Sequence, residues 1–323
     1  MINVGIVGGS GYTGGELIRL LLGHPGLRID FVYSSSRPHT PIVEHHSELL
    51  GQTNLKFTDQ INPDVAVVFL CLGHGKSASF LNEHPFSEET IIIDLSNDFR
   101  LEKDHLWNGR EFVYGLPEVN RLKIEKAKAI ANPGCFATAL QLALLPLAKA
   151  GQLNDAVHIN ATTGSTGAGV GLSATSHFSW RQDNLSWYKP FTHQHLNEIT
   201  ETLADLGASP ALQFIPQRGA FTRGIFATLY THYSGSLDEA LALYEGFYSP
   251  APFTHLSAQP ISLKQVVNTN NCVLHLHKHD EYLLITSALD NLIKGAAGQA
   301  IQNLNLIMGW EENLGLNLKA SVF

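Results

Sequence analysis

The sequence of 323 residues is short of cysteine, of basic charge and of long apolar runs. Its three cysteines, Cys71, Cys135 and Cys272, are too widely spaced for a disulfide framework or a CxxC metal motif, so we expect free thiols. Lys and Arg number 21 against 29 Asp and Glu, which gives a net charge of −8. Nucleic acids and anionic membrane surfaces need clustered Lys and Arg, so this balance argues against both as partners.

The chain also lacks the segments that direct proteins into membranes. The longest apolar run, VAVVFLCL at 65–72, is far shorter than the roughly 20 residues of a membrane span. The first residues, MINVGIVGGSGYTGGEL, begin a strand pattern at once and carry neither the basic segment nor the long apolar core of a signal peptide. These features predict a cytoplasmic protein with no membrane partner.

The pattern of apolar residues predicts two domains of different kinds. Over the first 135 residues, short strand-like runs that are apolar on both faces alternate with helical patterns. This alternation predicts an α/β fold with a Rossmann-type, doubly wound parallel sheet. Between 156 and 290 the β-like runs are longer, among them AVHINATTG and ISLKQVVNTNNCVLHLHKH, which indicates an α+β domain with a mixed or antiparallel sheet.

A glycine-rich turn follows the first strand and opens a helix. It holds two overlapping spacings, GxGxxG and GxxGxxG. Glycines let the backbone approach a pyrophosphate, and a helix N-terminus supplies N–H groups and a favourable dipole. An unliganded glycine turn is the alternative, but the strand–turn–helix context favours dinucleotide binding. The residues concerned are Gly8, Gly9, Ser10, Gly11, Tyr12, Thr13 and Gly14.

The end of the second strand indicates which dinucleotide is bound. NAD sites usually place an acidic residue there to bind the ribose 2′-hydroxyl. Here the hydroxyls of Ser34, Ser35 and Ser36 precede Arg37, and Asp30 lies too early in the strand. Hydroxyl groups and an arginine suit a 2′-phosphate, so the segment predicts NADP(H), with a plain polar turn as the alternative.

Cys135 stands directly after Pro-Gly, in AIANPGCFATAL, at the start of a helical pattern. A small apolar residue filling a corner is one interpretation. A nucleophile whose thiolate is favoured by the helix N-terminus is the other. A thiolate beside a nicotinamide suits acyl chemistry: it attacks an activated carbonyl, phosphate leaves, and a hydride reduces the thioester to an aldehyde.

Two groups of histidines stand out. His193 and His195, in YKPFTHQHLNEI, could supply the acid/base that such chemistry needs, although a surface loop or a partial metal site would use the same residues. Together with Cys135 these two histidines would make three ligands of a metal ion, and no fourth ligand is evident. We therefore predict no metal. His275, His277 and His279 alternate along one strand, which is typical of a solvated sheet face.

Seven segments together resemble the family of N-acetyl-gamma-glutamyl-phosphate reductases, which are related to aspartate-semialdehyde dehydrogenases. They are GGSGYTGGEL, DLSNDFR, YGLPE, ANPGCFAT, HFSWRQDNLSWYKPFTHQHLNEI, FTRGIFATLY and DNLIKGAAGQAIQNLN, in that order. The resemblance spans nearly the whole chain. It implies NADPH-dependent reduction of the small molecule N-acetyl-L-glutamyl 5-phosphate to N-acetyl-L-glutamate 5-semialdehyde and phosphate, in arginine biosynthesis, by a homodimer or homotetramer.

The resemblance also assigns domains and residue roles. It implies an NADP-binding domain at 1–135 plus 290–323, a catalytic domain at 136–289, and Cys135 as the nucleophile. It makes His193 or His195 the acid/base. It implies substrate contacts from Arg100, near the phosphate, and Asn132, and further cofactor contacts from Ser165, Gly167, Gly169, Asn291 and Lys294.

Three departures from the family pattern leave the acyl group open. The usual HRHxPEI is HQHLNEI here, with Gln194 and Asn197, and the usual PH before TRGI is PQ, with Gln217. We expect the substrate to carry an N-acetyl group, with an N-succinyl group as the alternative. A cysteine-dependent hydrolase or acyltransferase, or a non-catalytic NADP-binding sensor, would be functions of a different class.

Overall fold

The computed structural model describes residues 1–322, which form two compact units. Unit 1 comprises Met1–Gly134 and Ala296–Asn317, and unit 2 comprises Cys135–Gly295 and the residues from Leu318 on. The chain therefore leaves unit 1 directly before Cys135, the first residue of unit 2.

Unit 1 is built on a six-stranded sheet in which every strand is parallel to its neighbours, in the order β2-β1-β3-β4-β8-β7. The central strand β3 is buried at every position. Strands covered on both faces need apolar residues throughout, which explains why these runs lack an alternating pattern. The strands are β1 (Ile2–Val7), β2 (Leu27–Tyr33), β3 (Val67–Leu70), β4 (Ile91–Asp94), β7 (Val113–Tyr114) and β8 (Ala129–Ala131).

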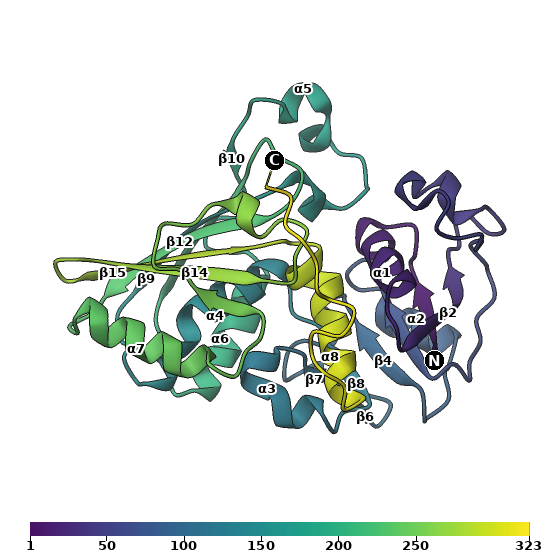
Figure 1. Cartoon of the computed structure of the whole chain (residues 1–323), viewed down its shortest axis with the longest axis horizontal. Helices are drawn as coiled ribbons and strands as arrows, with labels where there is room; N and C mark the ends of the chain where they lie inside the picture. The colour runs from purple at the N-terminus through teal and green to yellow at the C-terminus, as the bar shows by residue number, and fades with distance from the viewer. Residues whose placement is uncertain (323) are drawn as a thin grey trace. The chain divides into compact units, whose positions relative to one another are not determined.

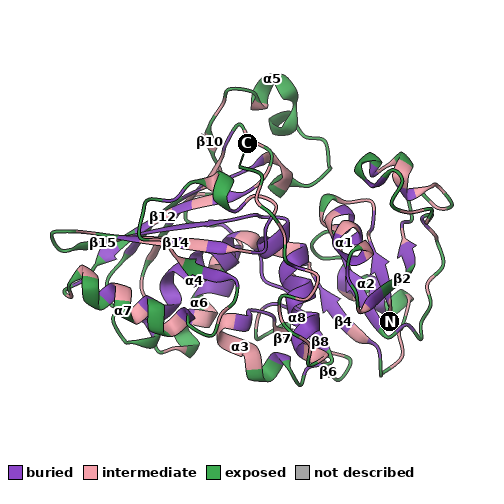
Figure 2. Cartoon of the chain, in the orientation of Figure 1, coloured by how far each residue is buried: buried purple, intermediate pink, exposed green. Residues whose placement is uncertain are grey.

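Four helices belong to unit 1, and they are α1 (Tyr12–Leu22), α2 (Ser77–Glu83), α3 (Pro117–Ile124) and α8 (Gly298–Ile307). A short hairpin, β5 (Leu106–Trp107) with β6 (Arg110–Glu111), precedes β7. Figure 2 shows α8 buried along its length, and the residues 298–306 are all buried. The C-terminal helix is therefore part of the core of unit 1 although most of unit 2 precedes it in the sequence.

Unit 2 contains a seven-stranded mixed sheet in the order β10-β11-β9-β12-β15-β14-β13. The pairs β11–β9 and β13–β14 are parallel, and the other neighbours are antiparallel. Buried and accessible residues alternate along β9 and β12, so one face of the sheet is covered and the other is only partly so. The strands are β9 (Val157–Thr163), β10 (Ser186–Trp187), β11 (Leu212–Arg218), β12 (Ile225–His232), β13 (Thr254–Leu256), β14 (Cys272–His279) and β15 (Tyr282–Leu289).

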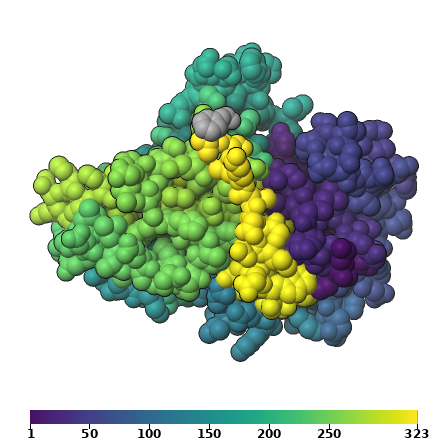
Figure 3. All heavy atoms as spheres, in the orientation of Figure 1, coloured from purple at the N-terminus to yellow at the C-terminus, as the bar shows by residue number. Residues whose placement is uncertain are grey.

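Helices α4, α6 and α7 lie on the covered face of this sheet (Figure 1). Every residue of α4 from Phe136 to Ala148 is buried, so this helix is fixed in the core of unit 2. The fourth helix, α5, is exposed and stands out with its neighbouring segments from the rest of unit 2 (Figure 3). The helices are α4 (Cys135–Lys149), α5 (Phe178–Arg181), α6 (His195–Asp205) and α7 (Leu237–Tyr248).

Pro146 lies inside α4 and has no N–H to donate to the carbonyl of Leu142, four residues earlier. The hydroxyl of Tyr248 on α7 donates to that carbonyl, and the hydroxyl of Tyr244 donates to the carbonyl of Ala143 at 2.6 Å. The Tyr248 bond satisfies the buried carbonyl that Pro146 leaves without a helix donor, and the two bonds together tie α7 to α4.

The sequence predictions of fold class are confirmed: unit 1 has the parallel sheet and unit 2 the mixed sheet. One strand boundary was wrong. The β-like run at 261–279 forms a strand only over β14, and a 3-10 turn at Leu263–Gln265 precedes it. The long C-terminal helical pattern is also divided, because a π-helical turn at Ile293–Ala297 precedes α8. Within residues 1–322, no helix is long and apolar enough to cross a membrane.

Candidate active site

The glycine turn lies between β1 and α1 in unit 1, and its glycines are needed for close backbone packing. Gly8 has a φ of +83°, and a β-carbon there would lie 2.5 Å from the carbonyl oxygen of Cys71. A β-carbon on Gly14 would lie 2.7 Å from the oxygen of Gly8, whereas one on Gly11 would meet only that oxygen, at 3.7 Å. The turn is therefore closely packed against the backbone at Gly8 and Gly14 and open at Gly11, as the binding of a pyrophosphate requires.

The N-terminus of α1 offers the positive end of a helix to this turn. No side chain within residues 1–322 caps the helix, whose N-cap is Gly11, and its first turn has no acidic residue. The first N–H groups of the helix and its dipole are thus available to an anion. The residues present fit the diphosphate of a dinucleotide.

Two histidines that the sequence analysis missed hold the turn in place. The Nε2 atoms of His45 and His46 lie 2.8 Å from the carbonyl oxygens of Ser10 and Gly9. Gly15 packs on the His46 ring, where a β-carbon would lie 2.5 Å from Cε1. The adjacent histidines in VEHHSEL are the signal in the sequence, but nothing local ties them to a turn 30 residues away.

The end of β2 is joined to the same turn by hydroxyl groups. Ser34 is buried, and its Oγ donates to the Oγ of Ser10 at 3.3 Å and lies 3.3 Å from that of Ser36. Arg37 follows and is exposed. The structure therefore brings the predicted serines to the glycine turn and leaves Arg37 accessible beside them.

Arg100 and Asn132 are brought together in unit 1. Arg100 is buried, and its Nε donates to the Asn132 carbonyl at 2.8 Å while its Nη2 donates to the Leu95 carbonyl at 2.9 Å. Asn132 accepts a hydrogen bond from Asn303 of α8 through its side-chain oxygen, at 3.1 Å. A fixed guanidinium thus lies next to the segment that leads, three residues later, to Cys135.

Burial raises the pKa of the nearby Asp94 carboxyl, at the end of β4, to about 6. The hydroxyls of Ser77 and Ser96 each donate to it at 2.6 Å and oppose this rise, as does the charge of Arg100. The carboxyl is therefore part of a hydrogen-bonded network that surrounds the Arg100 segment.

Cys135 is the first residue of α4 and is partly exposed, in contrast to the buried residues that follow it. A β-carbon built on Gly295 would lie 2.8 Å from the Cys135 β-carbon, so only glycine fits beside the thiol. The other two cysteines have surroundings unlike this one: Cys272 is fully buried, and burial raises the pKa of the Cys71 thiol far above its usual range. Of the three, only Cys135 combines access with a helix N-terminus.

The two predicted histidines lie beside α4. The Phe136 ring contacts those of His193 and His195, with centroid distances of 5.4 and 6.3 Å. The His193 Nδ1 accepts the backbone N–H of His195 at 3.2 Å, which places the His193 ring proton on Nε2. The His195 Nε2 lies 4.0 Å from the Oε1 of Glu198, one turn along α6, and both side chains are buried.

Tyr188 and Arg218 complete this side of unit 2, and neither stood out in the sequence as a site residue. The Arg218 guanidinium carbon lies 4.2 Å from the centre of the Tyr188 ring, and that ring is 5.7 Å from the ring of His193. Burial, and next the charge of Cys135, raise the pKa of Tyr188 to about 12. The phenol therefore stays neutral beside the thiol at physiological pH.

The remaining predicted cofactor residues lie in unit 2, whereas the glycine turn lies in unit 1. The segment with Ser165, Gly167 and Gly169 forms a 3-10 turn at Ser165–Ala168, and Gly169 has a φ of +75°. The Asn291 amide donates to the Oγ1 of Thr166 in this turn at 3.1 Å, so these predicted residues are neighbours. Lys294 is fully buried in the π-helical turn.

No group of three or more His, Cys, Asp or Glu side chains within the described chain is placed to hold a metal ion. His275 is partly buried, while His277 and His279 are exposed along β14.

Comparison with known families agrees with the division of the chain into two units. The model of the semialdehyde dehydrogenase NAD binding domain matches residues 3–127, and that of the semialdehyde dehydrogenase dimerisation domain matches residues 135–291. Among solved structures, aspartate semialdehyde dehydrogenase II from Vibrio cholerae superposes with a TM-score of 0.74, at 17% identity, over 96% of this chain and 99% of that one. The fold and site define a semialdehyde dehydrogenase, an oxidoreductase with a nicotinamide cofactor.

Similar sequences narrow the class. A protein from Flavobacterium johnsoniae named N-acetyl-gamma-glutamyl-phosphate reductase is 60% identical over the whole of both chains, and one of the same name from Christiangramia forsetii is 55% identical, also over the whole of both. The chain belongs to the N-acetyl-gamma-glutamyl-phosphate reductase family. The resemblance identified from the sequence is thereby confirmed.

Proposed function

We propose that the protein reduces N-acetyl-L-glutamyl 5-phosphate to N-acetyl-L-glutamate 5-semialdehyde with NADPH, and releases phosphate, in the cytoplasmic synthesis of arginine. The observation that carries this proposal is the accessible Cys135 at the N-terminus of α4, in a chain that matches relatives of that name from end to end. Acyl phosphates are activated carbonyl compounds, and a helix-terminal thiolate is a suitable nucleophile for them.

In the first half of the proposed reaction, Cys135 becomes acylated. The thiolate attacks the C5 carbonyl, a C–S bond forms, and the bond from carbon to the phosphate oxygen breaks. Arg100 and Asn132 would bind the departing phosphate, since the Arg100 fork is already oriented by backbone carbonyls and carries a full charge.

The second half requires a hydride, which bound NADPH supplies, and a proton. The oxygen of the resulting hemithioacetal must be protonated before the C–S bond breaks and the aldehyde leaves. We assign the proton to His195, because the buried Glu198 carboxylate can stabilise its imidazolium form. His193 fits this task less well, since its Nδ1 lone pair already accepts the N–H of His195.

The preference for NADPH would come from the end of β2. Ser34 and Ser36 offer hydroxyls, and Arg37 offers a positive charge, to a 2′-phosphate. The glycine turn, with Ser10, would hold the diphosphate, and the Ser165–Gly169 turn with Asn291 would supply the remaining cofactor contacts. Lys294 is fully buried, so its part in cofactor binding rests on the resemblance alone.

The subunits of a homodimer or homotetramer would pack together through the partly covered face of the unit 2 sheet. That face carries aromatic rings in contact: His158 stacks on Tyr230 at 4.8 Å, and Tyr230 meets Tyr282 edge to face at 6.0 Å, with 49% of Tyr282 exposed. Aromatic side chains of this kind gain from burial at an interface. The match to a dimerisation domain supports the assignment.

The test is the reverse reaction, followed as NADP⁺ reduction by the purified protein. N-acetyl-, N-succinyl- and unacylated glutamate semialdehyde are each supplied with and without phosphate. We expect phosphate-dependent reduction with the N-acetyl compound as the best substrate. A preference of tenfold or more for the succinyl compound, about 1.4 kcal/mol, would transfer the assignment to N-succinylglutamyl phosphate. Absence of phosphate-dependent reduction with all three would refute the proposal.

A further inference from the structure

Two arginines of unit 2, Arg181 and Arg218, are close enough for the charge of one to act on the pKa of the other, and Arg218 is bonded to Thr175 in the segment that leads to Arg181. Arg181 ends α5, and Arg218 ends β11. Within residues 1–322, neither forms an ion pair with Asp or Glu, whereas Arg223 of the same unit is paired with Asp290 at 3.1 Å. Like charges repel, so such a pair needs a reason to be kept close.

The position of Arg218 is fixed from two sides. Its guanidinium lies over the ring of Tyr188, at 4.2 Å, and its Nη1 donates to the Oγ1 of Thr175 at 3.2 Å. The pairing of β10 with β11 places Ser186 opposite Arg218, only two residues before Tyr188. Arg218 is therefore held by the strand pairing as well as by its own contacts.

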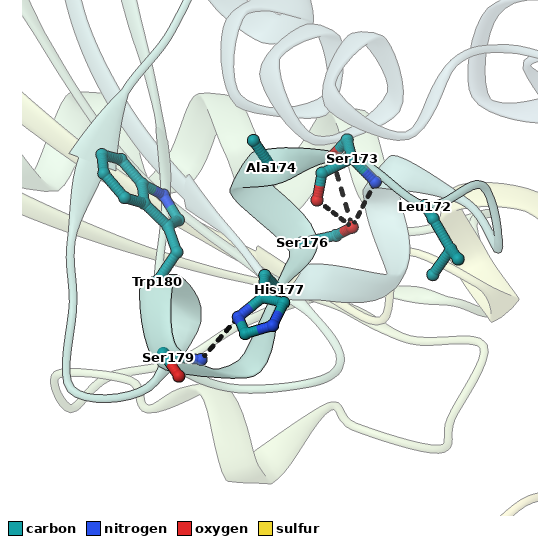
Figure 4. A pocket seen from close by; sticks show the side chains of 7 residues that line it. All are labelled: Leu172, Ser173, Ala174, Ser176, His177, Ser179 and Trp180. Carbon is teal, nitrogen blue, oxygen red and sulfur yellow. Dashed lines mark hydrogen bonds between the residues drawn. The ribbon is translucent and has the colours of Figure 1, made fainter.

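The segment before Arg181 is also ordered by local hydrogen bonds. Figure 4 shows the Ser176 hydroxyl bonded to Ser173 and the His177 Nδ1 accepting the N–H of Ser179, in the wall of an open pocket. The His177 contact caps α5, and Thr175 in the same segment is bonded to Arg218. The segment that leads to Arg181 is thus joined to Arg218 by a hydrogen bond.

Arg181 has donors with nothing to donate to. Its Nε and Nη2 are buried from solvent and, among the described residues, have no hydrogen-bond acceptor. Burial, and next the charge of Arg218, lower the pKa of Arg181. A desolvated cationic donor without an acceptor is unfavourable, and an anion between the two arginines would relieve both the desolvation and the repulsion.

The arginine pair is adjacent to the reaction chemistry. Tyr188, which carries Arg218 on its ring, lies 5.7 Å from the His193 ring, and its hydroxyl is influenced by the charge of Cys135. An anion held by the pair would therefore lie one aromatic ring away from His193.

We propose that Arg181 and Arg218 bind a carboxylate of the acyl substrate and so orient its carbonyl toward Cys135. The inference rests on the proposed function. The forked, planar guanidinium matches a carboxylate with two parallel hydrogen bonds, and the pair supplies two forks. The substrate phosphate is bonded to the carbon under attack, so an anion further along the substrate must be a carboxylate: the α-carboxylate, or the terminal one of a succinyl group.

The test compares Arg181→Gln and Arg218→Gln with the parent and with the matched control Lys264→Gln, which removes an exposed charge of unit 2 elsewhere. Arg218→Lys keeps the charge and covers the case in which the glutamine variant fails to fold. Three aldehydes are used with NADP⁺ and phosphate: N-acetyl- and N-succinylglutamate semialdehyde, and acetamidobutanal, which has no carboxylate. In parallel, calorimetry measures binding of N-acetyl-L-glutamate and N-succinyl-L-glutamate.

We expect each glutamine variant to raise KM by about tenfold or more for carboxylate-bearing aldehydes, while kcat and all kinetics with acetamidobutanal change little. A raised KM for both N-acyl compounds would identify the α-carboxylate as the group that the arginines bind. A raised KM for the succinyl compound alone would identify the terminal carboxylate of the succinyl group. Equal changes with all three aldehydes, or none, would overturn the proposal. If the parent protein reduces NADP⁺ with none of the three aldehydes, the proposed function fails, and this failure is separate from that of the arginine site. Calorimetry then decides: weaker binding in the variants supports the arginine site, and unchanged or undetectable binding overturns it.

Discussion

Gly295 and Cys135 lie in contact although 160 positions separate them in the sequence, and a β-carbon on Gly295 would come within 2.8 Å of the Cys135 β-carbon. The N–H of Gly295 donates to the Asp290 carbonyl at 2.9 Å, and Asp290 is in turn ion-paired with Arg223. The position of the thiol is therefore set by β15 and the turn that follows it, as well as by α4.

The first prediction follows from this contact. Gly295→Ala should displace Cys135 and lower kcat by one to two orders of magnitude, since a shift of about 1 Å at a reacting group can cost roughly a hundredfold. Binding of NADPH, measured by fluorescence titration, should change little. Gly246→Ala in α7 is the matched control, because no atom lies within 4 Å of its new β-carbon. An unimpaired Gly295→Ala enzyme would show that this contact does not set the position of the Cys135 thiol.

The second prediction separates the two histidines. His195→Asn and Glu198→Gln should both lower kcat, because the first removes the proton donor and the second removes the carboxylate that stabilises its charged form. His193→Asn should act mainly on KM. Steady-state kinetics over a range of pH values distinguish the cases. A larger loss of kcat in His193→Asn than in His195→Asn would reverse the assignment.

The third prediction concerns cofactor choice. Arg37→Ala should weaken NADPH by about 1.5–3 kcal/mol, the value of a hydrogen bond to a charged group, and should leave NADH nearly unchanged. Arg28→Ala, on the strand before it and bonded to Asn3, is the control for loss of a surface charge. Equal weakening of both cofactors would mean that Arg37 has no contact with the 2′-phosphate.

The fourth prediction uses the raised pKa of Asp94. The folded protein holds this carboxyl at a pKa of about 6, above its ordinary value of 3.8, so between these pH values the folded state binds more protons than the unfolded state. The contribution of Asp94 to stability is therefore lost as pH rises from about 4 to 6, by roughly 3 kcal/mol. Asp94→Asn should remove that dependence. Urea unfolding of both proteins at several pH values measures it, and parallel curves would contradict the assignment.

The extent to which this structure follows from the sequence differs between its parts. The strands of unit 1 are apolar on both faces and the glycine turn follows the first of them, so local patterns were sufficient for the parallel sheet and its cofactor loop. Strand β11 contains a proline and polar residues and was missed, because its place in the sheet depends on pairing with β9 rather than on its own pattern.

The same distinction holds for the site. Cys135 was found because its neighbours in the chain, Pro-Gly and a helical pattern, are the features that matter. Glu198 was missed although it lies one helical turn from His195, because only the fold shows that this face of α6 is buried. Gly295 and Arg181 were missed because their roles depend on contacts between distant segments: a close approach to the thiol, and a second arginine nearby. Such contacts have no local signature in the sequence.

The most direct test of the account is the activity of Cys135→Ser beside the parent protein, with NADPH binding measured on both. A serine hydroxyl stays protonated where the thiol ionises, so no thioester forms at a useful rate. We predict a loss of phosphate-dependent NADP⁺ reduction of about three orders of magnitude or more, with NADPH affinity within about twofold of the parent. If Cys135→Ser keeps more than about a tenth of the activity, the covalent mechanism proposed for this protein is wrong.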